Sequence, residues 1–166
     1  MKEFVNALVS TDRNPLIPAE KDYFGRLIGE WDFEWRDHLR TKEERSVKGE
    51  WIFSRILDGT GIQDIFICPS REERKKLKLP DAEYGTTIRT YRPATGNWEI
   101  YYCCSNENTR LEAVLEGDKI VLTEREEGAM KWVFSEITEN SFHWQNIMYE
   151  DNDWILCCDC RAVRRR

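Results

Sequence analysis

The sequence lacks the patterns by which several large protein classes are recognised. No apolar run approaches the roughly 20 residues that a membrane-spanning helix needs. The chain has no Gly-rich phosphate loop, no G-x-S-x-G nucleophile motif and no H-E-x-x-H zinc motif, and its only histidines are His38 and His143. No reaction can therefore be assigned from a motif, and a catalytic triad cannot be assembled.

An excess of basic residues is also missing. The 166 residues include 25 Lys and Arg against 31 Asp and Glu, which gives a formal net charge of -6. This balance argues against nucleic acid as a partner, because the phosphate backbone attracts basic surfaces. Residues Met1–Asn6 contain an early acid and no apolar core of a signal peptide, so we expect a cytoplasmic protein. The Arg164–Arg166 cluster is then expected to be a solvated end.

The six cysteines are expected to be reduced thiols that pack as small hydrophobic residues. They are Cys68, Cys103, Cys104, Cys157, Cys158 and Cys160. Cys158 and Cys160 share one face of a strand, but a C-x-C pair on a straight strand does not wrap a metal ion as C-x-x-C loops do. We therefore predict neither a metal site nor a disulfide.

What the sequence does contain is alternation of aromatic and charged residues. In Trp31–Trp35 the aromatic rings occupy every second position and acidic residues stand between them. A strand of this pattern has one apolar face for a core and one charged face for water. We expect it to be the first strand of an antiparallel barrel or sandwich.

The rest of the chain repeats this design. Asp58–Gly61 is a strong hairpin signal, and from Tyr84 onward turn residues recur every ten to twelve positions or so. The pattern predicts an all-β fold, an antiparallel up-and-down barrel of about ten strands, in one domain over 1–166 with an N-terminal arm over 1–17. Helix is expected only before Gly29 and in a short charged excursion between strands 3 and 4, over 70–80, where Ser70 and Glu73 form a capping box.

The start of this barrel resembles a known superfamily. A short helix that leads into Gly29-Glu30-Trp31 is similar to the N-terminal signature of the calycins, which include lipocalins, fatty-acid-binding proteins and nitrobindin-like barrels. The resemblance implies a lipocalin-like barrel, a pocket for a small apolar ligand, and a late basic residue, Arg161 or one of Arg164 to Arg166, packed across Trp31. Nitrobindin-like proteins hold haem through a late His; the last strand here has none, so no cofactor is predicted.

The candidate ligand-binding residues follow from strand alternation and from that resemblance. A ten-stranded barrel is wide enough to hold a ligand, and aromatic side chains suit a rigid apolar pocket. The candidates are Trp35, Trp51, Phe53, Arg89, Tyr102, Cys104, Trp132, His143, Trp144 and Cys158.

Several alternatives stay open at this point. Strands 3, 4 and 9 have apolar residues on both faces, so Asp64, Arg89 and His143 can face inward or outward. A binding protein for a small, largely apolar molecule, with or without an anionic group held by Arg89, is favoured over an enzyme that acts on an aromatic or unsaturated compound through His143 and Asp64. The 70–80 excursion is a surface linker or a lid, and the oligomeric state, including a homodimer, is not determined.

Overall fold

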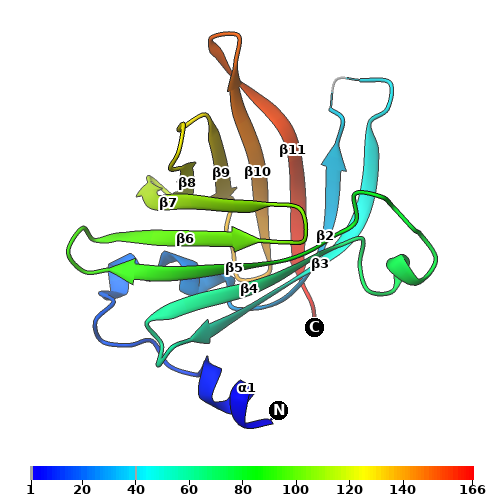
Figure 1. Cartoon of the computed structure of the whole chain (residues 1–166). Coiled ribbons are helices and arrows are strands. Elements are labelled where there is room, and N and C mark those ends of the chain that lie inside the picture. Colours follow the sequence, from blue (N-terminus) through cyan, green and yellow to red (C-terminus); the bar gives the residue numbers. More distant parts are fainter. Residues whose placement is uncertain (1, 40) are drawn as a thin grey trace.

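The computed structural model describes residues 2–39 and 41–166, which form a closed antiparallel barrel of ten strands (Figure 1). The barrel strands are β2 (Gly29–Asp37), β3 (Arg45–Ile56), β4 (Gly61–Cys68), β5 (Glu83–Arg92), β6 (Asn97–Cys103), β7 (Asn108–Glu116), β8 (Lys119–Glu124), β9 (Met130–Ser135), β10 (Ser141–Glu150) and β11 (Asp153–Arg164). Each strand pairs with its neighbours in sequence, and β11 pairs with β2 to close the ring. The predicted fold class is confirmed.

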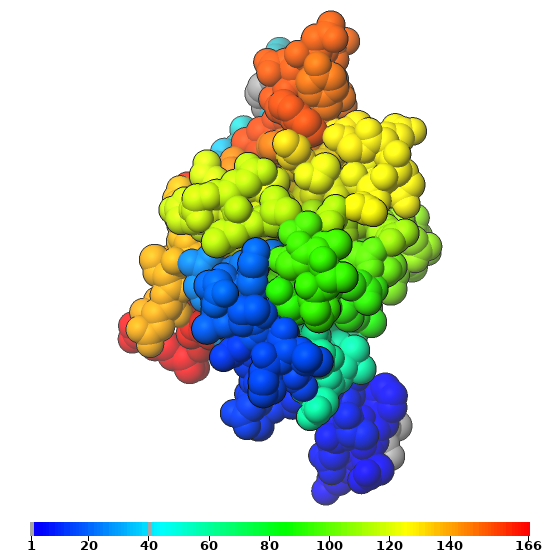
Figure 2. Space-filling view, turned by 90° about the vertical axis from the view of Figure 1, so that its left-hand side faces the viewer, coloured from blue at the N-terminus to red at the C-terminus, as the bar shows by residue number. Residues whose placement is uncertain are grey.

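The N-terminal arm contains a helix and a short additional strand. Helix α1 (Lys2–Leu8) buries none of its side chains and projects from the body of the molecule (Figure 2). Strand β1 (Val9–Ser10) pairs with the end of β3, where Val9 lies opposite Ile56. The arm then continues across one end of the barrel.

That end is closed by two 3-10 helices, η1 (Ala19–Lys21) and η2 (Tyr23–Leu27), where the sequence predicted one amphipathic α-helix. The apolar residues Tyr23, Phe24 and Leu27 of this segment are buried against the core, as expected for a segment that covers a barrel end. Short 3-10 turns of this kind are common as connectors between other elements.

Trp31 lies at this closed end beneath Arg164. Its indole donates a hydrogen bond to the Leu27 carbonyl at 2.7 Å, and the Arg164 guanidinium carbon lies 4.1 Å from the ring centre. Arg164 also donates to the Ile28 carbonyl at 2.7 Å, which ties the last strand to the first. The expected contact between Trp31 and a late basic residue is confirmed, and Arg164 is a packed side chain rather than a solvated one.

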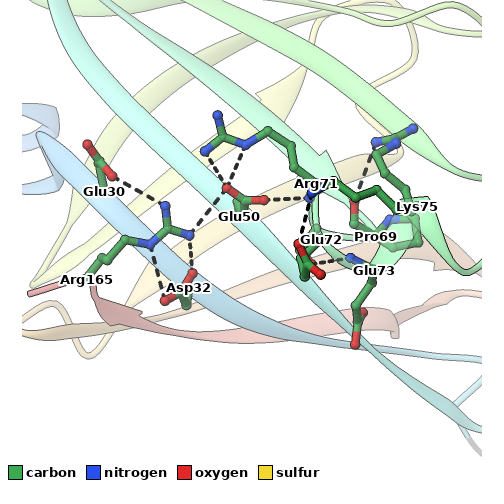
Figure 3. Close-up of polar contacts among 11 residues, drawn as sticks. Glu30, Asp32, Glu50, Pro69, Arg71, Glu72, Glu73, Lys75 and Arg165 are labelled. Atoms are coloured by element: carbon green, nitrogen blue, oxygen red, sulfur yellow. Dashed lines mark hydrogen bonds and ion pairs between the residues drawn. The ribbon is translucent and has the colours of Figure 1, made fainter.

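Arg165 is also held against the barrel. It pairs with Asp32 and reaches Glu50, which Arg71 contacts from the other side at 2.6 Å (Figure 3). Glu50 alternates with the inward Trp51 and therefore lies on the outer face of β3, where these arginines cover it. The expectation of a solvated basic terminus was wrong for Arg164 and Arg165, because each has specific partners.

The excursion between β4 and β5 is mostly irregular. Ser70 caps it as predicted, accepting the Glu73 backbone N–H at 3.2 Å, but only a 3-10 turn follows, η3 (Glu73–Lys75). The segment lies along β3, because the Ser70 N–H bonds the Lys48 carbonyl at 2.8 Å and Arg71 bonds Glu50. The first part of the excursion is thus a surface connection on the outside of the barrel.

Candidate functional site

A cavity of about 200 Å³ lies in the half of the barrel away from the 3-10 helices. Its walls come from strands on all sides and from the turn between β6 and β7. The lining residues are Trp35, Trp51, Phe66, Glu83, Thr87, Tyr102, Glu107, Trp132, Trp144, Asn146 and Cys158. Six of the ten candidate ligand-binding residues lie in this set: Trp35, Trp51, Tyr102, Trp132, Trp144 and Cys158.

The aromatic walls form one connected cluster. Trp144 stacks on Trp35 with ring centres 5.4 Å apart and contacts Trp132 at 5.9 Å. Trp132 meets the edge of Tyr102 at 5.4 Å. Rings packed against one another in this way make a rigid apolar surface with little freedom to collapse into the cavity.

Two polar atoms in these walls are buried without a hydrogen-bond partner among the described residues, the indole Nε1 atoms of Trp132 and Trp144. Two further polar side chains of the walls have neighbours, because the Trp51 indole interacts with Asp64 and the Asn146 side chain with the Cys158 thiol. A buried donor or acceptor without a partner costs about 1–3 kcal/mol, so native proteins retain few of them. The two indole donors in this cavity wall are therefore groups that an acceptor atom of a bound molecule would complement.

Glu83 brings a titratable group into the cavity. Its carboxyl bonds the Tyr102 hydroxyl, and Tyr102 reaches it because Gly85 lies between them: a Cβ at Gly85 would lie 2.4 Å from the Tyr102 oxygen. Burial, followed by the neighbouring Glu107 and Asp64 carboxylates, raises the pKa of Glu83 to about 7. Glu83 can therefore gain or lose a proton near neutral pH, which the ordinary carboxyl cannot.

Asp64 and Arg89 form a buried ion pair deeper in the barrel. Arg89 Nη2 lies 2.5 Å from Asp64 Oδ2, and both side chains are at most 1% exposed. The Arg89 guanidinium carbon lies 5.0 Å from the Phe24 ring centre and 5.3 Å from that of Phe53, beneath the cavity rather than in its lining. Burial raises the pKa of Asp64, and Arg89 opposes this rise.

This ion pair shows which faces of β4 and β5 point into the barrel. Arg89 and Asp64 both face inward, where each is 1% exposed. Because Asp64 already neutralises Arg89, the cation is not available to hold an anionic ligand. Phe53 is likewise buried in the core next to Arg89 and does not line the cavity.

His143 lies on the outer face of β10. Its neighbours Phe142 and Trp144 belong to the core, so alternation directs His143 outward. There Nε2 lies 2.9 Å from Asp159 Oδ2 of β11, and both residues are largely buried. His143 therefore does not reach the cavity and cannot serve as its acid or base.

The cysteine candidates are divided by the structure. Cys158 is buried and lines the cavity, while Cys104 is partly exposed beyond the end of β6 and does not. Cys160 is buried below Cys158, and burial raises the pKa of both thiols, so they are inert at neutral pH. No group of three or more metal-ligating side chains occurs within residues 2–39 and 41–166.

A second cavity, of about 190 Å³, adjoins the first and shares Trp35, Phe66 and Glu83 with it. Its outer wall includes Leu79 and Asp81, from the end of the β4–β5 excursion. Pro69, at the start of the excursion, lines the same cavity.

Sequence reasoning missed five lining residues: Phe66, Glu83, Thr87, Glu107 and Asn146. Glu83 and Thr87 share the face of β5 that carries Arg89, so an inward Arg89 would have brought both into the interior. Glu107 lies in a turn, where alternation gives no direction. Asn146 shares the inner face of β10 with Phe142 and Trp144 and could have been placed from them.

Comparison with known proteins supports the fold and does not name a function. No family model and no curated protein sequence matches this chain. Rv2717c from M. tuberculosis has a similar structure, with a TM-score of 0.61, 12% identity, and coverage of 93% of this chain and 100% of that chain. The S-type phycobiliprotein lyase CPES from Guillardia theta is similar with a TM-score of 0.60, 12% identity, and coverage of 91% and 95%.

At this identity the likeness shows the fold alone. No helix in the described part of the chain is long and apolar enough to cross a membrane.

Proposed function

We propose that the protein is a calycin-like barrel that binds one small, largely apolar molecule in the aromatic cavity. The observation that carries this proposal is the pair of buried indole N–H groups, of Trp132 and Trp144, that have no acceptor within the described residues. A ligand oxygen or nitrogen placed between them would satisfy donors that otherwise cost free energy. The ligand is therefore apolar over most of its surface and carries at least one hydrogen-bond acceptor.

The volume sets the size of the ligand. A cavity of roughly 150 Å³ lined by apolar side chains is enough to hold benzene. The cavity here, at about 200 Å³, suits one substituted aromatic ring or a molecule of that size. A long-chain fatty acid would need considerably more space.

The charges of the walls argue against an anionic ligand. Glu83 and the exposed Glu107 line the cavity, no basic side chain of the described residues lines it, and Asp64 neutralises Arg89. A ligand carboxylate would lie beside like charges. This leaves uncharged or cationic ligands.

An enzyme is the second candidate, and the Glu83–Tyr102 pair favours it. A carboxyl with a pKa of about 7, hydrogen-bonded to a phenol in an apolar cavity, has the properties of a general acid or base. This pair replaces His143 and Asp64, the acid–base candidates of the sequence. Turnover of a bound compound by the wild type and not by Glu83→Gln would favour this function over simple binding.

Binding can be tested with meta-tert-butylanisole, an uncharged aromatic ether, by isothermal titration calorimetry. We expect saturation at one molecule per chain. Trp132→Phe keeps the aromatic wall but removes one N–H donor, so the affinity should fall roughly 2- to 10-fold, as for the loss of one neutral hydrogen bond.

The matched control is Trp154→Phe. Trp154 lies at the exposed tip of β11 and does not line the cavity, so its replacement should leave the affinity unchanged. The proposal fails if the folded wild type shows no saturable uptake at high micromolar concentration. It also fails if the two substitutions weaken binding equally.

A further inference from the structure

We propose that the cavity selects an organic cation: an ammonium group or a protonated ring nitrogen attached to an apolar body. This inference rests on the proposed function and names the chemical class of the ligand. It comes from the carboxyls of Glu83 and of the exposed Glu107, which have no cationic partner among the described residues, and from the aromatic side chains that line the same cavity.

Other buried or half-buried carboxylates of the described residues have basic partners, and Asp159 has His143. Asp22 binds Arg55 at 2.5 Å, and Glu50 binds Arg71 at 2.6 Å. Glu83 is different, because its carboxyl bonds only the Tyr102 hydroxyl among the described residues. A carboxyl placed in an apolar cavity without a counter-ion is costly in its charged form, so it indicates a position where a cation belongs.

The described side chains that face the Glu83 carboxyl are acidic or neutral, which supports a cation site at this position. From β4, Asp64 and Cys68 face it, and from the β6–β7 turn Glu107 does. Glu107 bonds only the Thr109 hydroxyl through its side chain. Across the cavity, the thiol of Cys158 is neutral because burial raises its pKa.

Two arginines near Glu83 are committed to other partners. Arg45 lines the adjoining cavity with Glu83, but it bonds Asp37 at 2.8 Å and also pairs with Asp81. Arg74 donates to the backbone carbonyl of Glu83 at 3.0 Å rather than to its carboxyl. The Glu83 side chain is therefore left without a basic partner within residues 2–39 and 41–166.

The aromatic walls complete the site for a cation. Rings of Trp35, Trp132 and Trp144 line the same cavity as Glu83, and Trp is the side chain whose face attracts cations most strongly. Aromatic walls with an adjoining carboxylate are a recurring way to hold an ammonium group without burying a lysine or arginine counter-charge. The unpaired indole N–H groups would in turn hold an acceptor atom on the same ligand.

A bound cation should change the titration of Glu83. A nearby positive charge favours the carboxylate, so the pKa of Glu83 falls below its value of about 7 in the free protein. Between the two pKa values, binding releases a proton. The affinity for a permanently charged ligand should therefore rise up to about tenfold from pH 6 to pH 8, as ionisation of Glu83 becomes complete in the free protein.

The test compares two isosteric probes by calorimetry. One is meta-methoxyphenyl-trimethylammonium, whose charge does not titrate, and the other is the uncharged meta-tert-butylanisole. At pH 8 we expect the cation to bind at least about tenfold more tightly. Glu83→Gln should remove most of this difference and flatten the pH profile, and far-UV circular dichroism shows whether the variant is folded.

Glu116→Gln is the matched control, because Glu116 is an exposed carboxyl at the far end of β7 that does not line the cavity. It should change neither affinity. If both probes bind equally, or if meta-methoxybenzoate binds more tightly than the cation, the inference is wrong while the proposed function stands. If none of the three probes binds, the proposed function itself fails.

Discussion

Replacing Trp31 with alanine is expected to lower the free energy of unfolding by about 3–5 kcal/mol, the usual cost of removing a large buried aromatic side chain. Trp31 is fully buried, its N–H bonds the Leu27 carbonyl, and Phe142 packs against it with ring centres 4.8 Å apart. Its loss leaves a void at the closed end and removes the surface on which Arg164 rests. Urea denaturation of both proteins measures the difference.

Trp154→Ala serves as the control for that experiment. This residue is as large as Trp31 but lies at the exposed end of a hairpin, where it contacts Tyr149 and Lys131. We expect a cost below about 1 kcal/mol, in the range of surface substitutions. Equal costs at the two positions would contradict the assignment of Trp31 as the plug of the barrel end.

Arg89→Met is the second substitution with a large expected effect. It leaves Asp64 buried without a counter-ion, and breaking a buried ion pair on one side costs about 3–5 kcal/mol. The variant should be less destabilised at low pH, because the isolated carboxyl can then be protonated without penalty. Denaturation at pH 5 and pH 8 measures both effects.

The double variant Asp64→Leu/Arg89→Met tests whether the destabilisation comes from the unpaired Asp64 carboxylate. Replacing both charges by apolar groups removes the unpaired carboxylate, so the double variant should be more stable than Arg89→Met alone. A double variant that is less stable than Arg89→Met would show that the two residues are not paired in the folded protein.

The fold could be predicted because its signal is repeated along the chain. Alternation in Trp31–Trp35 and the hairpin at Asp58–Gly61 each specify local structure, and Leu57, Asp58 and Gly59 do adopt the positive φ angles of such a turn. Gly59 is required there, since a Cβ would lie 2.2 Å from the Asp12 carbonyl oxygen. Short connections then leave few topologies other than a meander.

The site could be predicted only in part, because it depends on which way a few individual side chains point. On β5, Arg89 stands among threonines on both faces, so alternation gave no preference for its burial. On β11, the pairing with β10 shifts register between Asn146 and Ile147, and Cys157 is the extra residue. Strict alternation from Cys158 would direct Trp154 inward, but beyond the bulge it pairs with Tyr149 and is exposed. No Gly or Pro in the sequence marks this bulge.

Glu83 illustrates a further limit of the sequence. A pKa near 7 cannot be predicted for this residue from the sequence, because the value depends on the burial of Glu83 and on the nearby Glu107 carboxylate. Both are properties of the closed barrel. The same is true of the unpaired indole nitrogens, whose lack of partners becomes visible only when the neighbouring strands are in place.

The most direct test of the account is a crystal structure of the protein grown with meta-bromoanisole, whose bromine gives an anomalous signal. The account predicts one bromine peak per chain inside the barrel, in contact with Trp35, Trp132 or Trp144, with the ether oxygen within hydrogen-bond distance of an indole Nε1. A filled interior with peaks only on the outer face, for example beside Ile88 and Tyr101, would contradict it.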